Sequence, residues 1–172
     1  MARLRRHDLP DSGAYHLTMR GVDGCDIFLD DQDRHSFLRF LRLATVRANW
    51  RLFAFCLMRN HFHLVVLGEM ENVSRGMHTL AFRHAQTFNR RHTRRGHLYS
   101  DRFYARVIRS DEHLATACAY VLENAERAGV RDWPWRGGEL FVDSETYACT
   151  GDCAGAHEKF GDASPPRPFN RR

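Results

Sequence analysis

Residues 50–67, WRLFAFCLMRNHFHLVVL, decide the fold of this chain. They form two apolar runs of strand length that are separated only by Arg59 and Asn60, a pattern typical of a tight β-hairpin. Successive side chains of a strand point to opposite faces, so His61 and His63 are predicted to share one face. The opposite face of the same strand is expected to pack on the core and carries Phe62, Leu64 and Val66.

Helices and further strands are predicted on both sides of this hairpin, from apolar periodicity and from capping residues. In chain order they are a strand at 14–20, a helix capped by Asp30, the hairpin, a helix at 73–88, a strand at 102–109 and a helix from Ser110 to Gly129. The order β-α-β-β-α-β-α predicts an α+β fold. We expect a ferredoxin-like sandwich with an antiparallel sheet and one extra C-terminal helix.

The chain is predicted to form one domain. Its 172 residues are enough to bury a core, and 43% hydrophobic residues are ordinary for a globular protein. We expect the domain at 13–142, after a basic arm at 1–12 and before a disordered tail at 143–172, where Gly and Pro-Pro occur. In that tail, Cys149, Cys153 and His157 match no common zinc-ligand spacing.

Composition also bears on location. No apolar run reaches the roughly 20 residues that cross a bilayer, and no apolar stretch follows the basic N-terminus. The five cysteines are scattered and odd in number, as expected of free thiols in a reducing compartment. The sequence therefore predicts a cytoplasmic protein without membrane contact, either a monomer or a homodimer.

The imidazoles of His61 and His63 form a half-site for a divalent cation, because two ligands on one face of a rigid strand lie close together. Imidazole is a borderline ligand, so the residue types do not choose between magnesium, manganese and zinc. An isolated His-x-His is more typical of two surface histidines on a sheet. The motif becomes informative only with partners.

The last predicted helix supplies such partners. At about 100° per residue, Tyr120 and Asn124 lie one turn apart on the flank of its apolar stripe. The phenol can act as a nucleophile, and the carboxamide oxygen can be a third metal ligand. A half-buried tyrosine with its hydroxyl in water is the other interpretation of Tyr120. The stripe itself consists of Leu114, Cys118, Val121, Leu122 and Ala125.

Arginine supplies almost all of the basic charge, since Lys159 is the only lysine among 26 basic residues. Its planar fork suits phosphate, although a genome rich in G and C would also favour Arg. Residues 75–109 hold nine Arg, one acid and interleaved aromatic residues, which favours binding of a single-stranded nucleic acid. The predicted DNA-binding side chains are Arg83, Arg90, Arg91, Arg94, Arg95, Arg102 and Arg106, with His16 and Arg20 of the first strand as further candidates.

Four separated blocks within residues 15–135 carry a family resemblance. They are YHLTMRG at 15–21, CLMRNHFHLVV at 56–66, FNRRHTRRGHLYSDRF at 88–103 and AYVLENAERAGV at 119–130, followed by WPW at 133–135. Together they resemble the single-tyrosine HUH transposases, in particular the REP-associated tyrosine transposases of bacteria. Several blocks in the right order are far more specific than His-x-His alone.

The resemblance implies a metal-dependent transposase that cleaves and rejoins single-stranded, hairpin-associated DNA. It implies that His61 and His63 bind a divalent metal, Mg²⁺ or Mn²⁺, and that Asn124 completes the metal shell. It further implies that Tyr120 attacks the DNA and forms a 5′-phosphotyrosine, leaving a 3′-hydroxyl. A phenol with a pKa near 10 is a poor nucleophile at neutral pH, and a metal that polarises the phosphate offsets this.

Two positions depart from the family pattern. Arg59 stands where a proline usually precedes the Asn-His of the hairpin, and Ala125 stands where a proline usually follows the Asn of the last helix. The second change removes a residue that would end or kink the helix, which bears on the orientation of Tyr120.

Other functions remain open on the sequence alone. The first is a domesticated DNA-binding protein of the same fold that cleaves weakly or not at all. The second is a phosphoester hydrolase that uses the two histidines and water, although the chain has no HExxH, P-loop or GxSxG motif. The third is an RNA-binding module, which lacks the aromatic signature expected on its sheet.

Overall fold

The computed structural model describes residues 9–138. In chain order these residues form β1 (Ser12–Arg20), the short 3₁₀ helix η2 (Val22–Gly24), α1 (Asp31–Arg47), β2 (Arg51–Leu57), β3 (His61–Glu69), α2 (Met70–Arg91), β4 (Tyr104–Ile108), α3 (Asp111–Arg127) and β5 (Arg136–Gly138). The predictions on the N-terminal arm before residue 9, on the tail at 143–172 and on the set Cys149, Cys153 and His157 concern residues outside those described.

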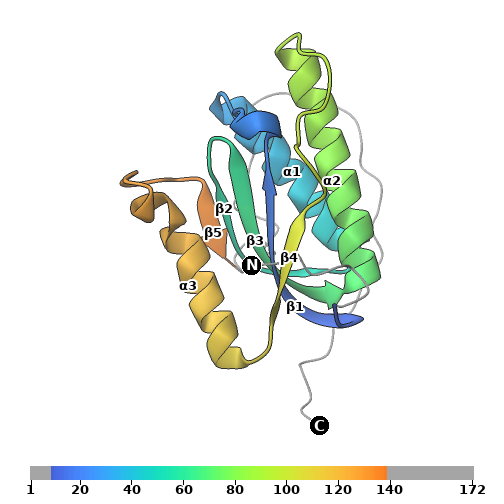
Figure 1. The fold of residues 1–172 in the computed structure, drawn as a ribbon, viewed down its shortest axis with the longest axis vertical. Coiled ribbons are helices and arrows are strands. Elements are labelled where there is room, and N and C mark those ends of the chain that lie inside the picture. Colours follow the sequence, from blue (N-terminus) through green and yellow to red (C-terminus); the bar gives the residue numbers. More distant parts are fainter. Residues whose placement is uncertain (1–8, 139–172) are drawn as a thin grey trace, which may run out of the picture.

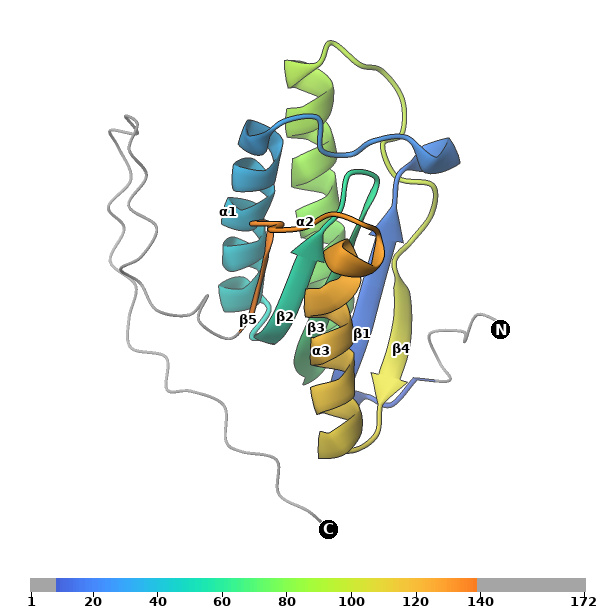
Figure 2. The ribbon, with the colours of Figure 1, turned by 90° about the vertical axis from the view of Figure 1, so that its left-hand side faces the viewer.

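The strands form one antiparallel sheet in the order β4-β1-β3-β2-β5. Helices α1 and α2 lie side by side against one face of the sheet, and α3 crosses the other face (Figures 1 and 2). The α+β, ferredoxin-like fold with an extra helix is therefore confirmed. Among residues 9–138, no helix is long and apolar enough to cross a membrane.

The predicted hairpin forms as expected. The backbone amide of Met58 donates to the carbonyl of His61 over 2.9 Å, which closes the turn around Arg59 and Asn60. Where the family usually has proline, the Arg59 guanidinium pairs with the Asp26 carboxylate at 2.6 Å. The departure from the family pattern at this position thus adds an ion pair at the turn and leaves the hairpin intact.

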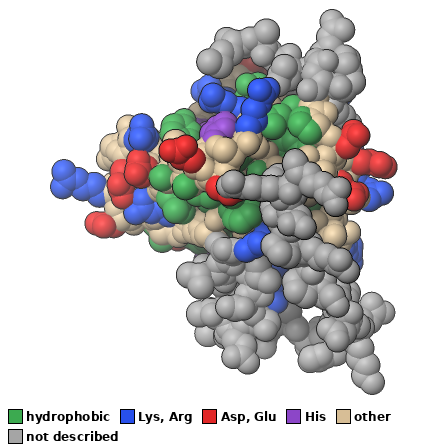
Figure 3. Space-filling model, turned by 90° about the horizontal axis from the view of Figure 1, so that it is seen from below, with side chains coloured by type: hydrophobic (Ala, Val, Ile, Leu, Met, Phe, Trp, Pro, Cys, Tyr) green, Lys and Arg blue, Asp and Glu red, His purple; other side chains and the backbone are tan. Residues whose placement is uncertain are grey.

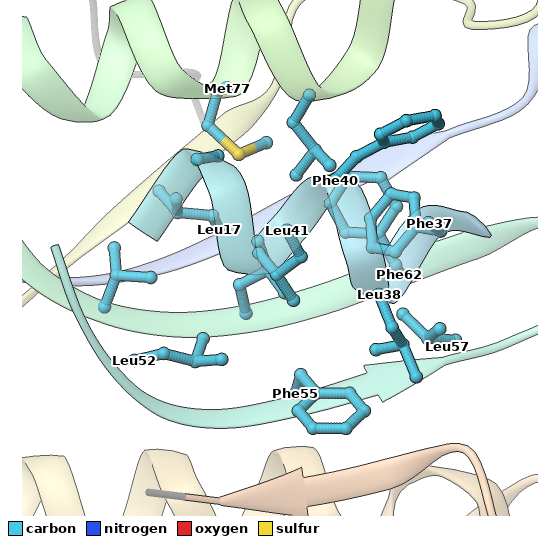
Figure 4. Packing of buried hydrophobic residues seen from close by; sticks show 14 of the residues in the cluster. Leu17, Phe37, Leu38, Phe40, Leu41, Leu52, Phe55, Leu57, Phe62 and Met77 are labelled. Carbon is cyan, nitrogen blue, oxygen red and sulfur yellow. The ribbon is translucent and has the colours of Figure 1, made fainter. Parts of the chain in front are cut away.

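Two apolar clusters pack on the two faces of the sheet. The larger one lies under α1 and α2, and it contains the alternating residues Phe62, Leu64 and Val66 of β3 together with Phe37 and Leu41 of α1 (Figure 4). The smaller one lies under α3 and is formed by short side chains of the sheet, by Cys56 and Val65, and by the α3 residues Ala117, Val121 and Ala125. The smaller cluster positions α3, and with it Tyr120, against the sheet.

Both predicted helix caps are present. The Asp30 side chain accepts from the backbone amide of Asp33 at the start of α1, and the Ser110 side chain accepts from that of His113 at the start of α3. Helix α2 is longer than its apolar pattern indicated and ends at Arg91. Residues 89–91 are therefore helical, so the helix extends three residues beyond its predicted end at 88. Strand β4 begins at Tyr104, two residues later than predicted.

Strand β5 was not predicted, because its sequence Arg-Gly-Gly carries no apolar alternation. Long-range contacts hold it at the edge of β2. The Trp133 indole donates to the carbonyl of Leu57 over 2.9 Å, and the amide of Leu57 donates to the carbonyl of Trp135 over 2.8 Å. Glycine is needed at 137, since a Cβ there would approach the Phe55 ring to 2.8 Å.

An ionic network joins the C-terminal end of α2 to the start of α1. The Arg91 guanidinium pairs with the carboxylates of Asp30, at 2.8 Å, and of Asp33. Asp33 is only 1% exposed, and it also accepts from the backbone amide of Leu29 and contacts the His92 ring. The hydrogen bond from Arg91 lowers the pKa of Asp30 to about 2. Arg91 therefore balances a buried negative charge.

Neighbouring arginines on α2 provide a test of this network. Arg91→Ala leaves the buried Asp33 carboxylate with fewer partners, so we expect it to lower the free energy of unfolding by about 1–3 kcal/mol. Arg90→Ala, at an exposed neighbouring position, is the matched control and should change it by less than about 0.5 kcal/mol. Urea unfolding of both variants measures the difference. Equal stability of the two would contradict a structural role of Arg91.

Candidate functional site

The candidate site lies on the α3 side of the sheet, where β1 ends and β3 begins. In the antiparallel register, Thr18 is opposite His63 and Arg20 is opposite His61. Alternation along both strands brings these residues and His16 to the face away from the larger apolar cluster. Tyr120 approaches the same face from α3. The ring centroids of His61 and His63 are 4.9 Å apart, so the predicted pairing of the two imidazoles is confirmed.

His63 is 7% exposed and is held at its Nδ1 atom. This atom lies 2.9 Å from Nε2 of His16 and 3.1 Å from the hydroxyl oxygen of Thr18, both on β1. The His16 and His63 rings are stacked with centroids 5.1 Å apart. Both contacts engage the same ring nitrogen, and among residues 9–138 no hydrogen bond is made by Nε2 of His63.

His61 is held by its neighbour in the hairpin. Its Nδ1 atom lies 2.7 Å from Oδ1 of Asn60, and Nδ2 of Asn60 donates to the carbonyl of Gly24 over 3.2 Å. An amide oxygen only accepts, so Nδ1 of His61 carries the proton and Nε2 carries the lone pair. In both histidines, therefore, Nδ1 lies within hydrogen-bond distance of another side chain of the protein.

The three histidines of the site are neutral at physiological pH. Burial lowers the pKa of His63 to about 3, and the neighbouring His16 and His61 add to this effect. Burial, together with the positive charge of Arg106, lowers the pKa of His16 to about 4. Burial and Arg20 lower the pKa of His61 as well. Neutral imidazole is the form that binds a metal.

Tyr120 is 41% exposed and lies beside these rings. Its ring centroid is 5.8 Å from that of His16 and 6.0 Å from that of His63, edge-on in both cases. The guanidinium carbon of Arg127 lies 5.5 Å from the centre of the Tyr120 ring, and Arg127 also pairs with Glu123 at 3.0 Å. A phenol and two imidazoles from three different elements therefore meet at one accessible position.

Helix α3 runs without interruption from Asp111 to Arg127. With Ala125 in place of the usual proline, the helix continues past Asn124, and this continuation brings Arg127 over Tyr120. Asn124 lies one turn after Tyr120 and is partly exposed. Its carboxamide makes no hydrogen bond to another residue of 9–138, and its predicted role as a metal ligand stays a prediction.

The predicted DNA-binding residues fall into three groups. Arg20 and Arg106 lie on the same sheet face as the histidines, and Arg106 is opposite His16 in the register. Arg90, Arg95 and Arg102 are exposed at the end of α2 and in the connection to β4. The remaining members are less available, since Arg83 is partly buried on α2, Arg91 pairs with Asp30 and Asp33, and Arg94 donates to Asn89 and Gly96.

The arginine-rich connection, residues 92–103 between α2 and β4, is attached beside the site by backbone hydrogen bonds. The amide of Val22 donates to Leu98, the amide of Ser100 donates to Arg20, and Gly21 bridges to Tyr99. These bonds attach the connection to the end of β1, next to the strand position that faces His61. The connection lies at the top of Figure 1. At the opposite end, acidic and basic side chains are interspersed (Figure 3).

Sequence reasoning missed the supporting residues Thr18 and Asn60. Thr18 is two residues from His16, so strand alternation alone places it on the same face; Asn60 precedes the motif directly. It also missed the group Asp30, Asp33 and His92, whose ligand atoms lie within 4.8 Å of one another. The two carboxylates of this group pair with Arg91, so the ionic network between α1 and α2 explains why these residues lie together.

The lowered histidine pKa values predict an acid-sensitive fold. Unfolded imidazoles bind protons near pH 6.5, whereas His16 and His63 in the folded chain do so only near pH 4 and 3. The unfolded state therefore binds more protons below pH 6.5, and stability falls with decreasing pH by up to about 1.4 kcal/mol per unit for each group. Urea unfolding between pH 7.5 and 5.5, with a chelator present, measures this.

The double replacement His16→Phe with His63→Phe removes both titrating groups and should reduce the pH dependence. A wild-type unfolding midpoint that is constant from pH 7.5 to 5.5 would contradict the neutral, buried state of these histidines.

Comparison with known proteins identifies the family. The family described as "Transposase IS200 like" matches residues 11–124, well over half of the chain. No curated protein matches the sequence. Among solved structures, the chain is similar to a REP-associated tyrosine transposase bound to a REP hairpin, with a TM-score of 0.62, 18% identity, and coverage of 79% of this chain and 82% of that one.

A candidate transposase from Deinococcus radiodurans R1 gives a TM-score of 0.47 at 17% identity, over 72% of this chain and 97% of that one. At 18% identity, the match to the REP-associated tyrosine transposase speaks to the fold alone. The family match covers β1, the three predicted metal ligands His61, His63 and Asn124, and α3 as far as Asn124. The chain therefore belongs to the IS200-like transposase family and is a DNA-processing transposase.

Proposed function

We propose that this protein is a metal-dependent transposase of the REP-associated type, which cleaves and rejoins single-stranded DNA through a 5′-phosphotyrosine on Tyr120. One observation carries the proposal: Tyr120 lies edge-on to the His63 ring, with centroids 6.0 Å apart, on the sheet face that also holds His61. If the histidines were only surface residues, or the tyrosine only a half-buried helix residue, there would be no reason for the three rings to lie together.

The donor set of the site fits a divalent metal. His61 and His63 are neutral, lie on one face of a rigid strand, and have their Nδ1 atoms engaged by the protein, which leaves Nε2 of each as the ligand atom. Asn124 would supply a carboxamide oxygen as third ligand. A bound Mg²⁺ or Mn²⁺ would polarise the scissile phosphate and stabilise the charge that develops on it.

In the proposed reaction, the phenol oxygen of Tyr120 attacks the phosphorus of a DNA phosphodiester. The new bond joins this oxygen to the 5′-phosphate, and the bond between phosphorus and the 3′-oxygen breaks. The phenol gives up its proton, and the departing 3′-oxygen takes up a proton to become a hydroxyl. A second 3′-hydroxyl can attack the phosphotyrosine in the same manner, which frees Tyr120 and joins new ends.

The DNA is proposed to approach along the end of β1. Arg20 and Arg106 lie beside the histidines, and the arginine-rich connection with Arg95 and Arg102 is attached to β1 by backbone hydrogen bonds. The structural relative is bound to a REP hairpin. A DNA hairpin with a single-stranded flank is therefore the substrate class that we propose for this chain.

A second candidate function is DNA binding without cleavage, as in a domesticated transposase. One observation favours it: the carboxamide of Asn124 has no partner among residues 9–138 that would hold it in a ligating position. The two functions differ in one measurable product, the covalent adduct.

Tyr120→Phe tests the nucleophile. The substitution removes only a hydroxyl at a 41% exposed position, so folding should be retained. We expect the covalent protein–DNA adduct that the wild type forms with Mn²⁺ and a hairpin oligonucleotide to disappear, on a denaturing gel. Tyr104→Phe, at another exposed tyrosine, is the matched control and should keep the adduct.

A Tyr120→Phe variant that forms as much adduct as the wild type would exclude Tyr120 as the nucleophile. A wild type that binds the hairpin but never forms an adduct would favour the function of DNA binding without cleavage. Full activity of the wild type in excess chelator would exclude the metal.

Arg90→Ala with Arg95→Ala tests the nucleic-acid surface. Both side chains are exposed, so their loss should weaken binding of single-stranded DNA without destabilising the fold. Each lost phosphate contact lowers the slope of log affinity against log salt by about 0.7, so the pair should flatten it by about 1.4. Fluorescence anisotropy across a salt series measures the slope.

Arg42→Ala with Arg47→Ala is the matched control, because these exposed arginines lie on α1. Their replacement should leave the slope unchanged. Identical slopes for both double variants would place the DNA-binding surface elsewhere.

A further inference from the structure

His16 lies between the proposed metal ligand and the proposed nucleophile. Its Nε2 atom is 2.9 Å from Nδ1 of His63, the two rings are stacked, and its ring centroid is 5.8 Å from that of Tyr120. Strand β1 lies between β4 and β3 in the sheet, so the backbone that carries His16 is hydrogen-bonded on both sides. It is partly buried and has no role in the proposed reaction so far.

The hydrogen bond between the two histidines has two alternative proton arrangements. In one, Nδ1 of His63 carries the proton and donates to the lone pair on Nε2 of His16. In the other, Nε2 of His16 donates, and His63 then carries its own proton on Nε2. A neutral imidazole has a single ring proton, so only the first arrangement leaves a lone pair on Nε2 of His63 for a metal.

We propose that His16 is a positioning residue of the metal site. Its Nε2 atom accepts a hydrogen bond from the protonated Nδ1 of His63, and this keeps the lone pair on Nε2 of His63 free for the cation. This inference rests on the proposed function, since it requires His63 to be a ligand. Residues that hold the second nitrogen of a metal-bound histidine fix both its tautomer and its ring orientation. Asn60 performs this task for His61, and His16 would perform it for His63.

Thr18 is the competing partner of His63, because its hydroxyl oxygen lies 3.1 Å from the same Nδ1 atom. A hydroxyl both donates and accepts, so Thr18 by itself selects neither tautomer. His16 also stacks on the His63 ring and is therefore the contact that restricts its orientation. We accordingly assign the larger effect on metal affinity to His16 and the smaller one to Thr18.

The same placement connects the metal site with α3. The edge-on contact of His16 with Tyr120 adds to that of His63, so the tyrosine ring rests against both members of the hydrogen-bonded pair. Loss of the His16 ring would remove one ring contact of Tyr120 and one of the two contacts at Nδ1 of His63. The metal affinity of the protein without DNA separates the first effect from any effect on cleavage.

The first experiment determines the tautomers in the metal-free wild type. Two-bond ¹H–¹⁵N correlation spectra distinguish a proton on Nδ1 from one on Nε2. We expect the Nδ1–H form for both His63 and His16, because Nε2 of His16 must be free to accept. A spectrum with His63 in the Nε2–H form would overturn the proposal.

The second experiment measures Mn²⁺ affinity by titration calorimetry, with circular dichroism as the check of folding. His16→Phe keeps a ring but removes the acceptor, and it should weaken binding about 10–100-fold. His16→Gln restores an acceptor oxygen and should recover most of the affinity. Thr18→Val should have the smaller effect, and His97→Gln, at an exposed position in the connection after α2, is the control that should have none.

The outcomes separate the two proposals. Wild-type affinity in His16→Phe would overturn the role of His16 and leave the metal site itself in place. A wild type without measurable Mn²⁺ binding would contradict the proposed metal site, and the role of His16 with it. Weaker binding in His16→Phe with no recovery in His16→Gln would also overturn the proposal, because the acceptor would then not be the feature that matters.

Discussion

The antiparallel pairing of β1 with β3 is the constraint on which the site depends. Its register sets Thr18 opposite His63 and Arg20 opposite His61, so polar side chains of two distant segments meet on one face. A shift of the register by one residue would turn the histidines towards the larger apolar cluster and expose Phe62 and Leu64. Burying the apolar face of β3 therefore fixes the functional face at the same time.

The layer formed by α3 completes the site from the other side. Small side chains in the cluster beneath it, such as Ala14, Ala54 and Ala125, allow the helix to lie close to the sheet. This packing brings a tyrosine into contact with imidazoles whose pKa values are lowered chiefly by burial. The fold thus brings neutral imidazoles, an accessible phenol and nearby arginines to one face of the sheet.

Local patterns were sufficient to predict most of the fold and the central residues of the site. Alternation in residues 61–67 placed His61 and His63 on one face, and helical spacing placed Tyr120 on the flank of its helix. Contacts between distant segments could not be predicted, because no local signal sets them. The His16–His63 hydrogen bond follows from strand register, the Arg91–Asp33 pair from the packing of α2 on α1, and β5 from the anchoring of Trp133 and Trp135.

The central claim is that the DNA becomes attached to the residue that α3 presents to the two histidines. Tyr120 is the only tyrosine between Arg109 and Arg127, so trypsin releases it in a peptide of its own. Mass spectrometry of the trapped protein–DNA adduct, digested with trypsin and a nuclease, is the most direct measurement. A nucleotide remnant on the peptide 110–127 is the result expected here, whereas a remnant on the peptides that contain Tyr15, Tyr99 or Tyr104 would contradict it.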